Sequence, residues 1–68
     1  MNADRKQTEH DDVKIVRSGA EHVCAINGCY ETIKRGEKHY RVHNVRHRIV
    51  EVRLHILCGV KHGWRESK

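Results

Sequence analysis

Apolar and polar residues alternate in the middle of the chain, which is the pattern of half-buried β-strands. In residues 38–45, Tyr40 and Val42 fall on one face, and polar side chains occupy the other. Residues 48–54 repeat the pattern, and residues 44–47 form the predicted loop between the two runs. The apolar face of the second run holds Val50, Val52 and Leu54. This part of the chain therefore predicts a β-hairpin.

Two further elements flank the predicted hairpin. Residues 13–17 read Val-Lys-Ile-Val-Arg, a short β-prone run that a Ser-Gly pair brings to an end. Residues 55–62 predict a short C-terminal helix, with Gly63 as its stop. On that helix, Ile56 and Val60 lie four residues apart and are expected to cover the hairpin.

The first 12 residues are polar and charged, without apolar periodicity. We expect residues 1–12 to form a disordered charged tail, and residues 13–66 to form a single domain. Gly28 and Gly36 lie in predicted turns, where we expect them to adopt a positive φ.

Chemistry-bearing side chains form two pairs that lie far apart in the sequence. Cys24 and Cys29 are separated by four residues, and His55 and Cys58 by two. Structural zinc sites collect four thiolate or imidazole ligands in this way, each pair chelating from one local turn. Because the chain has three cysteines, an odd number, a closed disulfide framework is disfavoured. We therefore predict one structural zinc ion.

The size and composition of the chain strengthen the case for a metal. Its 68 residues contain no Phe, one Trp and two Tyr, so the apolar core is thin. A chain this short buries only about 60% of its unfolded surface, and small scaffolds need a staple. Zinc binding in finger-like peptides contributes on the order of 10–16 kcal/mol at neutral pH. The metal would therefore decide between the folded and the unfolded state.

The segments between the two ligand pairs resemble a known class of zinc finger. After Cys-x4-Cys, residues 33–41 read Ile-Lys-Arg-Gly-Glu-Lys-His-Tyr-Arg, and residues 54–58 read Leu-His-Ile-Leu-Cys. This order resembles small bacterial and phage zinc-finger proteins, whose pattern runs Cys-x2-Cys, Ile-x-x-Gly-Glu-x-x-Tyr and His-x2-Cys. It is similar, more distantly, to the poly(ADP-ribose) polymerase-type finger. The resemblance implies a small α+β treble-clef domain, made of a zinc knuckle, a β-hairpin and a short C-terminal helix. The longer first spacing implies an enlarged knuckle.

The fourth ligand has an alternative. His62 lies four residues after Cys58 and can pair with it in place of His55. We favour His55, because His-x2-Cys fits the first turn of a helix and the pattern of the resembling proteins. The surface is the expected location of His22, His39, His43 and His47.

Treble-clef folds also host ββα-metal nucleases, in which His43, Asn44 and His62 would take the catalytic parts. Three cysteines and a histidine leave zinc no open position, however. The sequence also has no second cluster of acidic residues for another metal. We therefore expect a binding protein and not an enzyme.

The formal net charge is +5, and residues 13–68 carry 12 of the 14 Lys and Arg residues against five acidic ones. Such a basic domain suits a polyanionic partner. We expect nucleic-acid binding, to DNA more than to RNA, by a monomer or weak dimer. The expected contact residues lie on the hairpin and the turn before it: Lys34, Arg35, Lys38, Arg41, Arg46, Arg48 and Arg53.

The alternative function is a protein-interaction adaptor or inhibitor that docks on a larger enzyme or on the transcription machinery. Ile49, Tyr40 and Trp64 would then form the apolar centre of its surface. The sequence contains neither a membrane-length apolar run nor a signal-peptide core. We expect a cytoplasmic protein, in which thiols stay reduced and available to metal.

Overall fold

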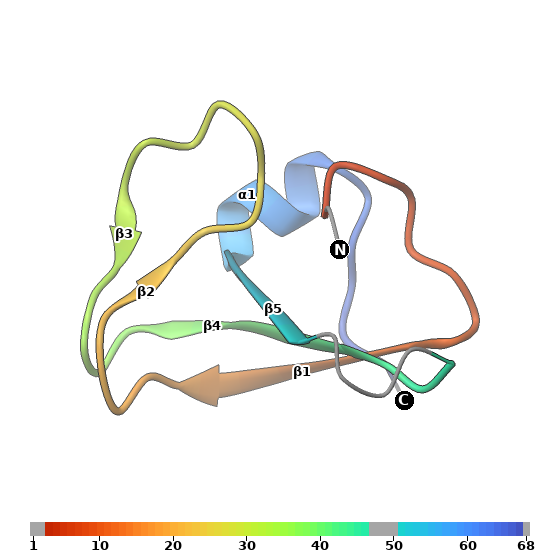
Figure 1. Cartoon of the computed structure of the whole chain (residues 1–68), viewed down its shortest axis with the longest axis horizontal. Coiled ribbons are helices and arrows are strands. Elements are labelled where there is room, and N and C mark those ends of the chain that lie inside the picture. The colour runs from red at the N-terminus through yellow and green to blue at the C-terminus, as the bar shows by residue number, and fades with distance from the viewer. Residues whose placement is uncertain (1–2, 47–50, 68) are drawn as a thin grey trace.

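The computed structural model describes residues 3–46 and 51–67. Its elements are β1 (Asp11–Arg17), β2 (His22–Val23), β3 (Thr32–Ile33), β4 (Lys38–Asn44), β5 (Glu51–His55) and α1 (Ile56–Lys61). One antiparallel sheet has the strand order β1-β4-β5, and β2 pairs with β3 in a second, small sheet (Figure 1). The chain is thus a small α+β domain, as predicted.

The predicted hairpin is confirmed as the pair β4–β5. Tyr40 lies opposite Leu54, and Val42 lies opposite Val52, so the apolar residues of the two strands share one face. Val13 of β1 joins the same face opposite Val42. Residues 48–50 of the predicted return strand lie outside the described residues, and β5 extends one residue further than predicted, to His55.

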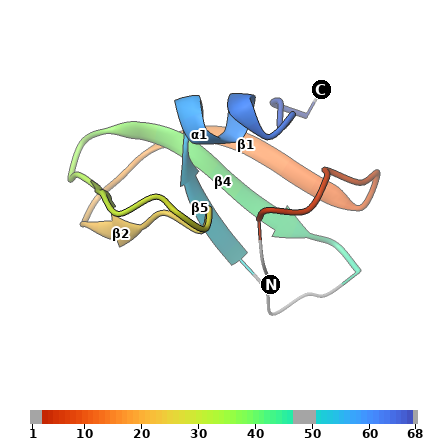
Figure 2. The same ribbon diagram turned by 90° about the horizontal axis from the view of Figure 1, so that it is seen from above.

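Helix α1 lies over the apolar face of β4 and β5 (Figure 2). It is shorter than predicted, because His55 still belongs to β5 and serves as the N-cap residue of α1. Ile56 and Val60 were both expected to cover the hairpin. Ile56 packs against the core, but the prediction is wrong for Val60, which is 57% exposed. Gly59 is the buried residue of the helix. The absence of a side chain there lets the helix backbone approach Tyr40 and Leu54 closely.

The other face of β4 carries a buried histidine. His39 is 0% exposed, which corrects the expectation of a surface position. Arg53 Nη1 donates to its Nε2 at 2.9 Å, and its Nδ1 lies 3.2 Å from the carbonyl oxygen of Glu37. The ring of His22, on β2, packs at 5.8 Å between centroids. Alternation alone could not reveal this burial, since β2 covers the face that an isolated hairpin would expose.

The N-terminal segment is folded from residue 3, in contrast to the expected disordered tail over residues 1–12. Ala3 is buried, and its carbonyl oxygen accepts a hydrogen bond of 2.9 Å from Trp64 Nε1. Asp4 accepts a bond of 2.8 Å from the backbone N–H of Asn27. The segment therefore joins the C-terminal part of the chain to the loop between β2 and β3.

A buried carboxylate explains why this polar segment is ordered. The guanidinium of Arg5 donates to both oxygens of Asp11, at 2.7 and 2.8 Å. Thr8 N and Asn44 Nδ2 donate to the same carboxylate, each at 2.8 Å. The hydrogen bond to Arg5 holds the pKa of the Asp11 carboxyl well below its usual range. Arg5 also lies over the Trp64 ring, 5.3 Å from its centroid, in a cation–π contact.

The close approach of α1 to the sheet gives a direct test. A Cβ added at Gly59 would lie 2.6 Å from Tyr40 Cδ2 and 2.8 Å from Leu54 Cδ1. Because such overpacking typically costs about 1–3 kcal/mol, Gly59→Ala should lower the free energy of unfolding by that amount. Urea denaturation with zinc in excess measures it. Gly19→Ala is the matched control, since a Cβ there meets nothing within 4 Å. Equal stability of the two variants would contradict the packing described.

Candidate metal centre

The four predicted ligands come together in space. One ligand atom from each of Cys24, Cys29, His55 and Cys58 lies within 4.8 Å of all the others. Two sulfurs at ~2.3 Å from a tetrahedral zinc ion lie roughly 3.8 Å apart, so the cluster has the dimensions of a single site. The four side chains are therefore close enough to hold one metal ion.

The first ligand pair lies on the loop that joins β2 to β3. The two strands pair antiparallel, with Val23 opposite Thr32, and so bring the ends of the loop together. Gly28 has a φ of 87°, as predicted, and Cys29 N donates to the Ile26 carbonyl oxygen at 3.2 Å. These features close the tight turn that aims both sulfurs at the same point.

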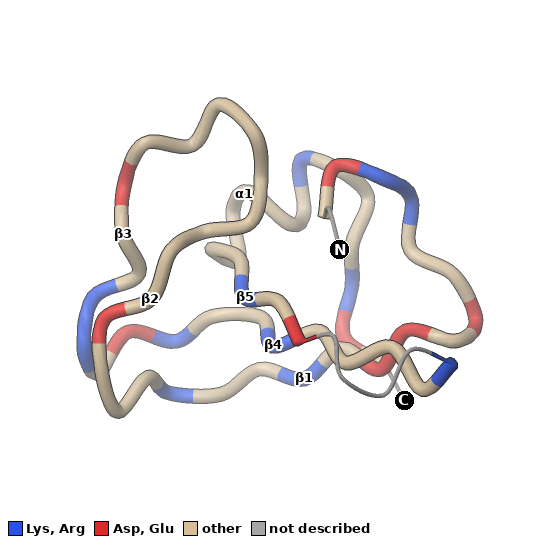
Figure 3. Tube along the Cα trace, viewed as in Figure 1, with Lys and Arg blue, Asp and Glu red and all other residues tan. Residues whose placement is uncertain are grey.

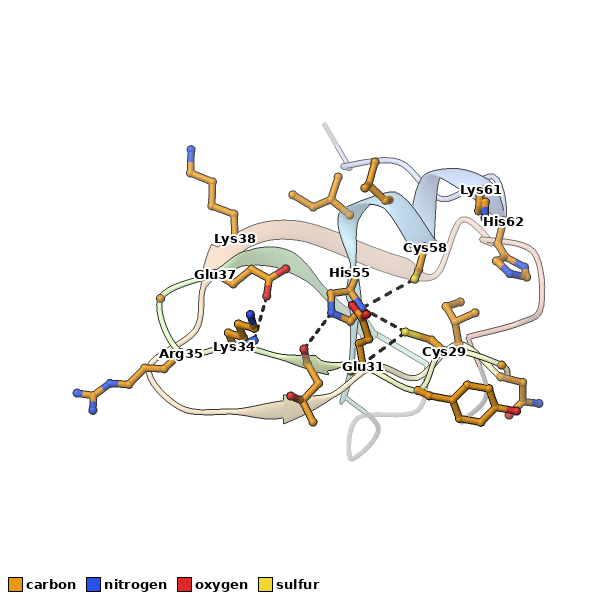
Figure 4. A pocket seen from close by; sticks show the side chains of 18 residues that line it. Cys29, Glu31, Lys34, Arg35, Glu37, Lys38, His55, Cys58, Lys61 and His62 are labelled. Atoms are coloured by element: carbon orange, nitrogen blue, oxygen red, sulfur yellow. Dashed lines mark hydrogen bonds between the residues drawn. The ribbon is translucent and has the colours of Figure 1, made fainter.

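The second pair lies at the junction of β5 and α1. His55 ends the strand, and Cys58 lies in the helix three residues later. His55 Nε2 is 3.2 Å from the carbonyl oxygen of Thr32, which assigns the ring proton to Nε2. Nδ1 is then free to accept, and it lies 3.4 Å from the Cys29 sulfur and 3.8 Å from that of Cys58 (Figure 4). The contact with Thr32 thus leaves Nδ1 available to bind a metal ion.

The thiols differ in their tendency to ionise. Hydrogen bonding with the backbone of Glu31 lowers the pKa of Cys29. Burial raises the pKa of Cys58 to about 12. Cys29 is therefore the easier thiol to deprotonate, and Cys58 needs a nearby cation to become a thiolate at neutral pH. A bound divalent metal supplies that charge.

The alternative ligand His62 lies at the C-cap of α1 and is exposed. It is not among the residues of the metal cluster in the described part of the chain. His22 and His43 are half-buried, and His47 lies outside the described residues. The geometry therefore favours His55 as the fourth ligand.

The predicted nucleic-acid contacts fall into two groups. Lys34, Arg35 and Lys38 are exposed; the first two lie in the turn between β3 and β4, and Lys38 begins β4. Figure 3 shows Lys and Arg positions along this part of the trace. On the hairpin, by contrast, Arg41 Nε and Arg53 Nη2 lie 3.6 and 3.2 Å from the same oxygen of Glu51. Arg46 is exposed after β4, and Arg48 lies outside the described residues. The charge of the hairpin face is thus partly neutralised, whereas Lys34, Arg35 and Lys38 form no ion pair with any residue that the structure describes.

The apolar centre expected for a protein-docking surface is wrong for two of its three residues. Tyr40 and Trp64 belong to the buried core. Tyr40 lies beneath α1, and Trp64 is covered by the N-terminal segment. Ile49 lies outside the described residues.

A cleft of about 1130 Å³ opens beside the metal cluster, between the β2–β3 loop and α1. Two large side chains on its walls, Tyr30 and Leu57, are 96% and 81% exposed. Sequence reasoning missed both residues. The signal available in the sequence was their position, since Tyr30 follows Cys29 and Leu57 precedes Cys58.

Comparison of the chain with known protein families, with curated proteins and with solved structures finds no match. The resemblance to bacterial and phage zinc fingers therefore stays a prediction from the motifs. Within the described residues, every helix falls short of the length and apolar character that crossing a bilayer requires.

The ligand assignment predicts how two histidine variants differ. His55→Ala removes a ligand, and we expect it to abolish stoichiometric zinc binding. His62→Ala should retain one zinc per chain, because His62 lies outside the cluster. Metal analysis of the purified variants measures both. Loss of zinc in His62→Ala, with zinc retained in His55→Ala, would overturn the assignment.

Proposed function

We propose that the metal is one structural zinc ion and that the domain is a treble-clef zinc finger. Three thiolates and one imidazole are a ligand set that zinc favours. The order of elements supports the fold: a ligand-bearing loop between β2 and β3, the hairpin β4–β5, and then the second ligand pair at the junction of β5 and α1. In this proposal β1 and the N-terminal segment are additions to the finger.

We further propose a binding role rather than an enzymatic one. Four protein ligands would fill the tetrahedral coordination of zinc, which leaves no position for a reactive water. The metal would then be structural: it would hold the loop between β2 and β3, helix α1 and the turn between β3 and β4 in fixed positions relative to one another.

The partner that we propose is a nucleic acid, with DNA expected ahead of RNA. The observation that carries this proposal is the exposed turn with Lys34, Arg35 and Lys38. Among the described residues, none of these three side chains forms an ion pair, whereas Arg41 and Arg53 share Glu51. Unpaired cations on a rigid turn can neutralise phosphates and release counterions. The contact surface is therefore assigned to the turn rather than to the hairpin face.

Salt dependence tests this proposal. Wild-type protein should bind labelled DNA at low salt, with an affinity that falls steeply as salt rises. Replacing Lys34, Arg35 and Lys38 by Gln should flatten the slope of log K against log salt by about 2–3, because each phosphate contact adds ~0.7–0.9 to it. Fluorescence anisotropy titrations at several salt concentrations measure the slope, and labelled RNA of the same sequence tests the preference for DNA.

A matched variant separates position from net charge. Replacing Lys6, Lys14 and Arg65 by Gln removes the same total charge from other exposed segments. This control should keep a slope close to that of the wild type. An equal loss in both triple variants would assign binding to net charge alone, and no binding at low salt would contradict a nucleic-acid partner. A protein partner that survives nuclease treatment would then favour the adaptor.

A further inference from the structure

The cleft beside the metal cluster is lined by the candidate ligands and by exposed apolar and charged side chains that the metal site does not use. Cys29, His55 and Cys58 contribute to its lining, so the ligands form part of its wall. One side is the loop between β2 and β3, and the other is α1. Small-molecule sites measure roughly 300–1,000 Å³. This cleft, of about 1130 Å³, is open and also takes in residues of the turn between β3 and β4.

Two exposed apolar side chains flank the cleft, one on each wall. Tyr30 follows Cys29 on the loop, and Leu57 precedes Cys58 on the helix. Both are almost entirely exposed, although Tyr40 and Trp64 are buried. The other Tyr and the Trp of the chain are therefore part of the core, whereas the ring of Tyr30 is exposed beside the cleft. An exposed tyrosine ring offers a flat surface for stacking.

Cationic groups lie at both ends of the cleft. Figure 4 shows Arg35 and Lys38 extending outward at one end, and Lys61 beside His62 at the other. In the described lining, four Lys or Arg side chains face two Glu. One of these acids, Glu37, is engaged with the backbone N–H of Lys34 at 3.0 Å. A polyanion that runs along the cleft would meet positive charge on entering and on leaving it.

We propose that the cleft binds single-stranded nucleic acid, with Tyr30 stacking on a base and the cations at the two ends contacting phosphates. This inference rests on the nucleic-acid role proposed above and names the form of the ligand. Base stacking on an aromatic side chain requires an unpaired base with an open face, which a duplex does not offer. The basic turn alone would not distinguish the two forms, because it contacts only phosphates.

Binding of two matched ligands tests the inference. The probes are a labelled 12-nucleotide oligothymidine and a 12-base-pair duplex, titrated with zinc-loaded protein. Wild type should prefer the single strand. Tyr30→Ala should weaken single-strand binding at least about fivefold and leave duplex binding within about twofold, because stacking contributes ~1–3 kcal/mol per base. Since Tyr30 is 96% exposed, this variant should retain its fold and its zinc.

Two control variants sharpen the result. Tyr30→Phe keeps the ring and should bind the single strand as tightly as the wild type. Val23→Ala shortens an exposed apolar residue of β2 that does not line the cleft, and it should also bind normally. Crosslinking to an oligonucleotide that carries 5-iodouracil should modify the peptide containing Tyr30. Crosslinks confined to peptides outside the cleft would overturn the inference.

The remaining outcomes separate this inference from the proposal on which it rests. If salt-dependent binding persists but Tyr30→Ala binds the single strand as well as the wild type, the cleft assignment fails and the basic turn stands. If the wild type binds neither probe at low salt, both proposals fail. If the wild type binds a peptide but no nucleic acid, and Tyr30→Ala no longer binds that peptide, the cleft recognises protein and the inference is overturned.

Discussion

The tie between two distant ligand pairs is the constraint on which this structure depends. Cys24 and Cys29 lie on the loop between the two strands of the small sheet, and His55 and Cys58 lie where the main sheet passes into the helix. Apart from this cluster, a hydrogen bond of 2.8 Å from Ala25 N to the Arg53 carbonyl oxygen joins the loop to β5. A metal held by all four side chains would fix the two sheets and the helix as one body, and would set the width of the cleft.

A second, metal-independent network closes the opposite end of the sheet. Arg5 links the buried carboxylate of Asp11 to the ring of Trp64, and so ties the N-terminal segment to the C-terminal one. This network adds a large buried ring to a core that otherwise consists of aliphatic side chains, Cys24 and one tyrosine. The small apolar core is thus supported on two sides. The hydrogen bonds around Asp11 stabilise one end of the sheet, and the ligand cluster lies at the other.

Local pattern and spacing were sufficient to predict β1, the hairpin β4–β5 and the four clustered side chains, but not the small sheet of β2 and β3. Alternation places Tyr40 and Val42 on the buried face, and the paired spacing predicts which four side chains cluster. What could not be predicted depends on contacts between segments distant in sequence. His39 is buried because β2 packs on it, and the first residues are ordered because Asp11 is buried. The exposure of Tyr30 follows from the path of the enlarged loop, which the sequence does not specify.

The most direct test of this account is the far-ultraviolet circular dichroism of the protein before and after its metal is fully removed by a chelator. We expect the stripped protein to lose the signal of its sheet and helix, and to regain it when one equivalent of zinc is added. The reason is that zinc binding contributes on the order of 10–16 kcal/mol to folding in finger-like peptides, and this chain has little apolar core of its own. An unchanged spectrum in protein shown to be free of metal would contradict the central claim.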